Sequence, residues 1–305
     1  MQTFASNKEK IKGKPFFRRH RDALTAAVIL AIPLGVWIIF SGYPMVWGLV
    51  LGFLEWGSLG EAPHFVWFDN FITFFTSEYY YMALVRTLYI GGLAFIIPTL
   101  LGLIGALLLN RVKCLKGLFR TLWYIPAVTS AVATSQIFKI FMDPYTGIVN
   151  NMITAGGGNP IFFDQEVGWS VFWIVLYSTW KGLGAQILLW LAALQSIDSS
   201  VVEAAEMDGA SRARIFFRIS IPQMAPLIVF ILINGFVGAM QVYEQVVFIT
   251  NGGPAGQTEV LAYRIMYDAF WDHDFGMAGA ASMIMLLITF FFSLVVFKRQ
   301  KKESL

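Results

Sequence analysis

Six long apolar segments alternate with polar loops along the chain. A helix needs roughly 20 mainly apolar residues to cross the hydrocarbon core of a bilayer, and each segment reaches that length. The pattern therefore predicts an all-α integral membrane protein in which one domain, residues 25–297, contains six transmembrane helices. These predicted helices cover residues 25–49, 83–109, 120–142, 169–195, 224–249 and 276–297.

The composition changes this picture little. Of the 305 residues, 57% are hydrophobic and only 13% are charged, whereas soluble domains carry about 25% charged residues. The single cysteine, Cys114, excludes an internal disulfide. The first apolar run contains Pro33 and lacks a short signal-peptide core followed by an A-x-A cleavage site. We therefore interpret it as a retained transmembrane helix.

Basic residues distinguish the two sides of the predicted membrane protein. Most of the 22 lysines and arginines lie in the two terminal segments and in the loops that follow the second and fourth apolar segments. The alternate loops, residues 50–82, 143–168 and 250–275, hold only Arg264. Cytoplasmic loops carry an excess of positive charge. Both termini are therefore expected in the cytoplasm, with residues 1–24 and 298–305 as tails.

A polar and basic stretch, residues 198–226, separates the fourth and fifth apolar segments. Ser200 and Glu203 match an S-x-x-E capping box, and Asp198 and Ser199 are further N-cap candidates. The stretch is too polar to cross a membrane, so these signals predict a helix that begins in a loop.

The same stretch then changes direction. Gly209 allows a sharp turn, after which a second short helix would carry Arg212. Pro222 and Pro226 are expected to break the chain that follows, because proline lacks an N–H and clashes with the preceding turn. The stretch therefore predicts an exposed helical hairpin.

The spacing of this hairpin resembles the coupling segment of binding-protein-dependent ABC importer permeases. The matching positions include an E-A-A run, a D-G-A run and the two prolines. In that family the segment docks in a groove of the cytoplasmic ATPase subunit. The resemblance implies that the coupling surface consists of Glu203, Ala204, Ala205, Asp208, Gly209, Ala210 and Arg212.

Further positions resemble the carbohydrate branch of this family, the maltose and glycerol-phosphate type subunits. They include T-N-G-G-P at residues 250–254, Thr258, Glu259 and Tyr267. The resemblance implies a bacterial inner or plasma membrane permease. Its partners would be a second permease subunit, two cytoplasmic ATPase subunits that bind ATP and Mg, an extracytoplasmic solute-binding protein, a carbohydrate substrate and membrane lipid.

Motifs for other chemistry do not occur in the sequence. It has no G-x-x-x-x-G-K-[ST] phosphate loop, no H-E-x-x-H and no G-x-S-x-G, and its three histidines lie far apart. We therefore expect no enzymatic activity, no metal site, no cofactor in this chain and no nucleic-acid partner.

Charged residues inside the apolar segments are candidates for the substrate pathway, because a charge at the bilayer centre costs roughly 2.5–3.5 kcal/mol on insertion scales. Lys181 lies near the midplane of the fourth segment, and Glu244 lies in the outer third of the fifth. An ammonium at that depth needs a partner. We expect Lys181 to hydrogen-bond either substrate hydroxyls or a carboxylate such as Glu244.

Small and polar residues recur around these charges at helical spacing. Asn234, Gly238, Gln241 and Gln245 follow one another at steps of four, three and four. Such stripes suit either tight helix packing or a substrate pathway. The resemblance to the maltose-type subunit favours the pathway. It gives the full candidate set as Lys181, Gly182, Ala185, Asn234, Gly235, Gly238, Ala239, Gln241, Val242 and Glu244.

Two alternatives remain open from the sequence. A permease for glycerol phosphate or another small polar solute is one, although a phosphate ester favours more than one arginine and none lies at mid-depth. An ATP-independent secondary transporter is the other, although no internal repeat is evident. In the loop 251–275, the carboxylates Glu259, Asp268, Asp272 and Asp274 predict an acidic rim for the solute-binding protein.

Overall fold

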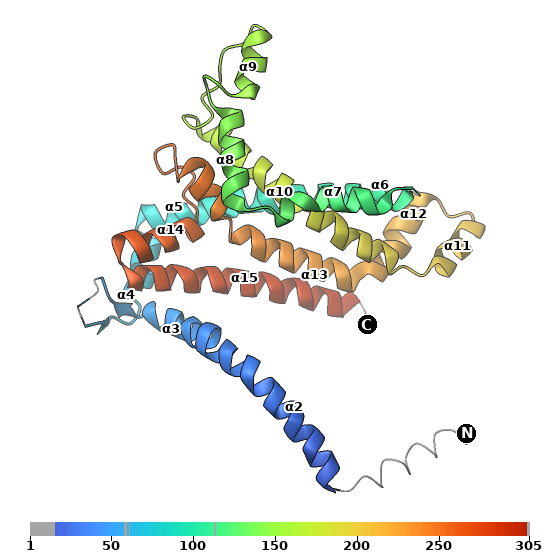
Figure 1. Cartoon of the computed structure of the whole chain (residues 1–305), viewed down its shortest axis with the longest axis horizontal. Helices are drawn as coiled ribbons and strands as arrows, with labels where there is room; N and C mark the ends of the chain where they lie inside the picture. The colour runs from blue at the N-terminus through green and yellow to red at the C-terminus, as the bar shows by residue number, and fades with distance from the viewer. Residues whose placement is uncertain (1–15, 58–59, 61, 113, 304–305) are drawn as a thin grey trace.

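The computed structural model describes residues 16–57, 60, 62–112 and 114–303. Four long helices lie side by side and make the body of the protein (Figure 1). They are α6 (Gly92–Arg111), α10 (Val167–Gln195), α13 (Ile221–Met240) and α15 (Phe275–Glu303).

Shorter elements connect and extend these four. Before α6 come α2 (Phe16–Trp37), η1 (Ile38–Gly42), α3 (Tyr43–Leu51), β1 (Leu54–Glu55), β2 (His64–Phe65), α4 (Asp69–Thr76), α5 (Glu78–Arg86) and η2 (Thr87–Gly91). After it come α7 (Lys116–Val128), α8 (Ala131–Met142), α9 (Ile148–Ala155), α11 (Ser199–Met207), α12 (Arg212–Ile215), η3 (Phe216–Ser220), η4 (Val246–Thr250), α14 (Leu261–Tyr267) and η5 (Asp268–Asp272). The η elements are single π-helical turns.

The two ends of the body differ (Figure 1). The hairpin α11–α12 and the C-terminal end of α15 lie at one end. The antiparallel pair β1–β2, with α4 and α14, lies at the other. There the Asn70 side chain donates hydrogen bonds to the carbonyls of Gly52 and Leu54, at 3.1 and 2.9 Å. These bonds fix α4 against the segment that follows α3.

Apolar side chains fill the contacts among the four long helices. One buried cluster joins α6, α10 and α13 through residues such as Ala106, Leu191 and Ile231. A second joins η2, α10 and η4 through Ile90, Ile174 and Val246. By contrast, α2 leaves the body, and its described side chains are exposed. An exposed apolar helix of this kind is suited to lipid or to a partner's membrane helix.

The prediction of an all-α fold with six membrane-crossing segments is confirmed. Within the described residues, four helical stretches are long and apolar enough to cross a membrane, and six when each bent helix pair counts as one span. The four are Thr25–Leu51, Glu78–Arg111, Arg212–Met240 and Phe275–Gln300. The bent pairs are α7 with α8 and α10 with α11.

The span predicted near residues 120–142 is a bent pair of helices and not a single helix. The chain bends by 93° between α7 and α8. Thr129 has an extended backbone, with ψ at 150°, and its hydroxyl donates to the Pro126 carbonyl at 2.7 Å. That side-chain bond offers the backbone an alternative to a further helical turn. As a result, α8 projects away from the four-helix body, together with α9 (Figure 1).

The boundaries predicted for the fifth helix are also wrong. The helix runs without interruption from Arg212 to Met240, through both prolines that were expected to break it. Pro222 closely follows the π-helical turn η3, and Pro226 lies one turn further on, so both prolines are accommodated inside the continuous helix. At its far end the helix ends at Met240, nine residues before the predicted end at residue 249, and η4 follows after a short non-helical segment.

Candidate functional site

The hairpin starts with a cap that differs from the predicted capping box. The Asp198 carboxylate accepts a hydrogen bond from the Ser200 N–H at 2.9 Å, which makes Asp198 the N-cap of α11. Ser200 is therefore already inside the helix, and Glu203 lies too far along it to reach back. Hydrogen bonds from Ser200 hold the pKa of Asp198 below its usual value.

The turn of the hairpin depends on Gly209, whose φ of +77° is in the left-handed region. The Gly209 N–H donates to the Glu206 carbonyl and the Ala210 N–H to the Ala205 carbonyl, both at 3.0 Å. This pair of bonds is a Schellman motif, which glycine closes without the strain that a Cβ would add. The predicted turn at Gly209 is confirmed.

The second half of the hairpin starts at Ser211. Its hydroxyl accepts a hydrogen bond from the Arg214 N–H at 3.3 Å and caps α12. Most of the predicted coupling residues are exposed, namely Glu203, Ala204, Asp208, Gly209 and Arg212, whereas Ala205 and Ala210 are half-buried. Met207 at the tip is 89% exposed. The hairpin therefore offers a small-residue face with an apolar tip to a partner at the end of the bundle (Figure 1).

Lys181 is half-buried on α10, and its Nζ donates to the Thr129 carbonyl at 2.8 Å. Thr129 is the residue at which α7 ends, where the unpaired carbonyls carry partial negative charge. The ammonium therefore stabilises the break between α7 and α8. Of the two partners expected for Lys181, substrate hydroxyls or a carboxylate such as Glu244, the carboxylate is not observed, because among the described residues only Arg264 forms ion pairs. Contact with substrate hydroxyls stays a prediction.

Tyr177, one turn before Lys181, fixes the other side of this break. Its hydroxyl lies 2.7 Å from the Thr134 hydroxyl and donates to the Ala131 carbonyl at 3.1 Å. Tyr177 is fully buried and Thr134 nearly so. Together with Lys181, Tyr177 anchors α8 and the end of α7 to α10.

The pathway candidates on α13 and after it divide into two sets. Asn234, Gly238, Gln241 and Glu244 are exposed, and a Cβ on Gly238 would meet nothing within 4 Å. Because the helix ends at Met240, Gln241 and Gln245 do not continue its face as the stripe predicted. The exposed set is nevertheless in one short stretch of chain, where it can contact a solute.

Most of the other candidates lie where helices of this chain pack against one another. Ala239 and Val242 are 5% and 3% exposed, and a Cβ on Gly91 of η2 would lie 2.7 Å from the Ala239 carbonyl. Gly235 packs against the Phe95 ring. On α10, Gly182 has open space around it, and Ala185 is half-buried.

The sequence analysis missed Gly184, two residues beyond the candidate Gly182. A Cβ on Gly184 would lie 2.0 Å from the Trp123 carbonyl oxygen and 2.9 Å from the Tyr124 Cα, both in the backbone of α7. The sequence feature that could have pointed to Gly184 was its place as a second glycine in the G-L-G-A run of the fourth segment. Only the structure shows which glycine touches a neighbouring helix.

The acidic rim predicted for residues 251–275 is partly wrong. Asp268 is fully buried. Arg264, one turn earlier, places its guanidinium 2.5 Å from the carboxylates of Asp268 and Asp272. Arg264 also donates to the Tyr79 hydroxyl. Burial raises the pKa of Asp268 to about 7, and the Arg264 charge opposes that rise. Asp274 instead caps α15 by accepting from the Met277 N–H at 2.9 Å.

Comparison with known proteins identifies the family to which this chain belongs. A family model described as the binding-protein-dependent transport system inner membrane component matches residues 98–302, more than half of the chain. The chain belongs to this family. The match begins within α6 and includes the α7–α8 break, the hairpin and every candidate residue named above.

Individual relatives support this assignment. The chain is 32% identical over 272 residues to the lactose transport system permease protein LacF of Rhizobium radiobacter, covering 87% of this chain and 90% of the relative. It is 30% identical over 272 residues to the sn-glycerol-3-phosphate transport system permease protein UgpA of Yersinia pestis, covering 88% and 92%. In fold it is similar to a bacterial ABC transporter involved in the import of the acidic polysaccharide alginate, with a TM-score of 0.80 at 24% identity over 95% of this chain and 99% of that chain.

The protein is therefore an integral inner-membrane permease of an ABC importer, and the resemblance drawn from the hairpin is confirmed. Family membership decides against the ATP-independent secondary transporter.

Proposed function

We propose that this permease forms half of the translocation pathway for a sugar or oligosaccharide and couples it to a cytoplasmic ATPase through the hairpin α11–α12. The observation that carries the coupling is the exposed, glycine-closed turn at Gly209 in a chain of this family. ATP and Mg would be bound by two ATPase subunits, and none of this chain's residues takes part in hydrolysis.

The connections of the hairpin support a coupling role. The hairpin joins α10, at a bend of 67°, to the continuous helix that begins at Arg212 and contains α13. The Asp198 N–H also donates to the Gln223 side chain at 3.2 Å, which ties the start of the hairpin to α13. A partner that moves the hairpin would therefore move both helices that carry pathway candidates. ATP binding would favour one of two arrangements of these helices.

The pathway residues favour a hydroxyl-rich solute. Asn234 and Gln241 supply amide donors and acceptors, and Glu244 supplies a carboxylate acceptor, all exposed. Arginine, the usual partner of a phosphate, is absent from the candidate set. A lactose permease is among the relatives, which agrees with a sugar. Glycerol phosphate is the second candidate, because UgpA is also a relative.

Orientation and partners follow from the same features. The basic hairpin and the C-terminal end of α15 lie at one end of the body, which we assign to the cytoplasm together with both termini. The solute-binding protein would dock at the opposite end, and a second permease subunit would complete the pathway. This assignment makes the protein a multi-pass component of a bacterial inner membrane.

Reconstitution tests this proposal. Proteoliposomes that contain this chain, its partner permease and the ATPase should accumulate a labelled mono- or disaccharide only with ATP and the solute-binding protein. As a control, the ATPase is omitted. Saccharide uptake that continues without ATP, or uptake of glycerol 3-phosphate but of no saccharide, would contradict the proposal.

A further inference from the structure

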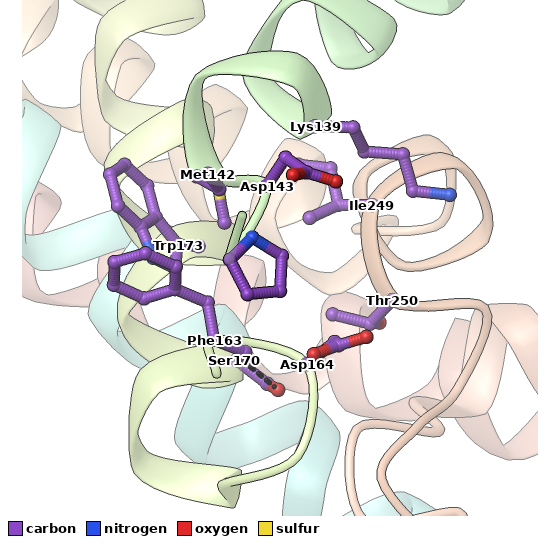
Figure 2. Close-up of a pocket in the computed structure, with 10 residues that line it drawn as sticks. Lys139, Met142, Asp143, Phe163, Asp164, Ser170, Trp173, Ile249 and Thr250 are labelled. Carbon is purple, nitrogen blue, oxygen red and sulfur yellow. Dashed lines mark hydrogen bonds between the residues drawn. The ribbon is translucent and has the colours of Figure 1, made fainter. Parts of the chain in front are cut away.

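A pocket of about 360 Å³ lies between the end of α8, the loop before α10 and the end of η4 (Figure 2). Its volume is within the range of small-molecule sites. Three chain segments line it, residues 139–144, 163–173 and 249–250. The η4 residues that line the pocket, Ile249 and Thr250, follow Gln241 and Glu244 in the chain.

One wall of the pocket is aromatic and rigidly held. Phe163 and Trp173 pack edge to face, with ring centroids 5.1 Å apart, and they are only 4% and 8% exposed. The buried Ser170 hydroxyl donates to the Phe163 carbonyl at 2.9 Å, as the dashed line in Figure 2 shows. Asn150 fixes the same loop by donating to the Ile161 carbonyl and accepting from the Ile161 N–H. This wall is therefore formed before any ligand arrives.

The Trp173 indole N–H is buried and has no hydrogen-bond acceptor among the described residues. A buried donor without an acceptor costs about 1–3 kcal/mol. Aromatic walls also suit sugars, because the apolar C–H faces of a sugar ring pack against them.

The polar side of the pocket carries two carboxylates and one ammonium, from Asp143, Asp164 and Lys139. Asp143 is already engaged, because its Oδ1 accepts from the Tyr145 N–H and from the Thr146 N–H and hydroxyl. Hydrogen bonds from Thr146 hold the pKa of Asp143 below its usual value, so it is charged at neutral pH.

Asp164 and Lys139 are exposed, and neither forms an ion pair among the described residues. They leave one acceptor and one donor group for a ligand. The excess negative charge disfavours carboxylate and phosphate ligands.

We propose that this pocket is an outer subsite that binds one end of a neutral saccharide before the saccharide enters the translocation pathway. The wall of Phe163 and Trp173 takes the apolar face of a sugar ring, Asp164 accepts a hydrogen bond from a ring hydroxyl, and Lys139 donates one. This inference rests on the proposed import of sugars and adds both a location and a preference for uncharged sugars.

The test uses the full chain in lipid nanodiscs and saturation-transfer NMR, with lactose, maltose and raffinose as neutral probes and lactobionate as an acidic one. At least one neutral probe should bind, and lactobionate should bind several-fold more weakly. Asp164→Asn should weaken neutral binding about tenfold, because a charge-assisted hydrogen bond is lost. Asp164→Lys should favour lactobionate.

Glu166→Gln is the matched control, because Glu166 is an exposed carboxylate two residues away that does not line the pocket. It removes the same charge and should change binding less than twofold. The inference is overturned if no neutral probe binds the wild type, if lactobionate binds as tightly, or if Asp164→Asn and Glu166→Gln are indistinguishable. ATP-dependent saccharide uptake with an unchanged KM in Asp164→Asn would overturn the subsite and leave the proposed function intact.

Discussion

Gly184 of α10 lies directly against the backbone of α7, whereas Gly182, two residues earlier on the same helix, has open space around it. The two positions therefore form a matched pair for substitution by alanine. A Cβ at position 184 would lie 2.0 Å from the Trp123 carbonyl oxygen. Ordinary contact begins near 3.4 Å, so α7 and α10 would have to separate by about 1.4 Å.

The expected magnitude follows from this separation. Forcing extra volume into a packed contact costs roughly 1–3 kcal/mol. At position 182 the same substitution meets nothing, and alanine in a helix interior gains up to about 1 kcal/mol over glycine. The propensity gain applies at both positions and cancels, so the two variants should differ by the packing cost, about 1–3 kcal/mol. For a chain of this size that corresponds to a difference of roughly 2–5 °C in Tm.

Thermal unfolding of the purified chain in one detergent, followed by intrinsic fluorescence, measures this difference. Gly182→Ala should melt at or above the wild-type temperature, and Gly184→Ala well below it. ATP-dependent uptake should fall in Gly184→Ala, because separating α7 from α10 also stretches the bond from Lys181 to Thr129. Equal melting temperatures for the two variants would refute the packing argument.

The remaining predictions concern the hairpin, the break, the buried ion pair and the topology. Gly209→Val should abolish ATP-dependent uptake without loss of membrane insertion, because a β-branched residue is strained at positive φ. Gly209→Asn should retain uptake, and equal uptake in the two variants would contradict this prediction. Lys181→Met should lower the Tm and the uptake rate. Because Lys181 and Glu244 form no pair, the stability changes caused by Lys181→Met and Glu244→Gln should add within about 0.5 kcal/mol. A larger coupling energy between the two substitutions would show that the residues do interact. Asp268 has a folded-state pKa of about 7 against an ordinary 3.8, so its protonated form stabilises the fold and stability should fall as pH rises between these values. The Tm of the wild type should therefore be higher near pH 5.5 than near pH 8, and Asp268→Asn should flatten this dependence; an unchanged slope would argue against a buried, titrating Asp268. In a Cys114→Ser background, an impermeant thiol reagent should label Gln257→Cys from outside and Met207→Cys only after the cytoplasmic side is opened, and the reverse pattern would invert the topology.

The positions of the long helices could be predicted from the sequence, because the bilayer requires a minimum length of apolar chain. Their breaks could not. Between α7 and α8 the segment stays apolar, and the extended backbone at Thr129 is stabilised by its own hydroxyl and by Lys181 from a distant helix. Pro222 and Pro226, the most obvious breakers in the sequence, lie inside a continuous helix.

The hairpin was predictable because its signals are local. The left-handed turn favours a glycine at position 209, and an acidic or hydroxyl residue is the expected cap. The pathway was less predictable, because a stripe of small residues reports spacing along one helix and not what that helix contacts. Gly238 and Ala239 are neighbours in the sequence, yet Gly238 is open and Ala239 is buried against Gly91.

The contacts of the hairpin decide which helices follow its movement. The chain joins the hairpin directly to α10 and α13. In addition, the Gln223 side chain on α13 accepts a hydrogen bond from the N–H of Asp198, where the hairpin begins. α7 is held to α10 at Gly184 and again by Lys181, so it should follow α10. The segment α2–η1 has no such attachment, because its described side chains are exposed and only α3 reaches the body, against α15. A displacement of the hairpin would therefore carry α7, α10 and α13 together, and the exposed residues from Asn234 to Glu244 would move relative to whatever partner surrounds α2.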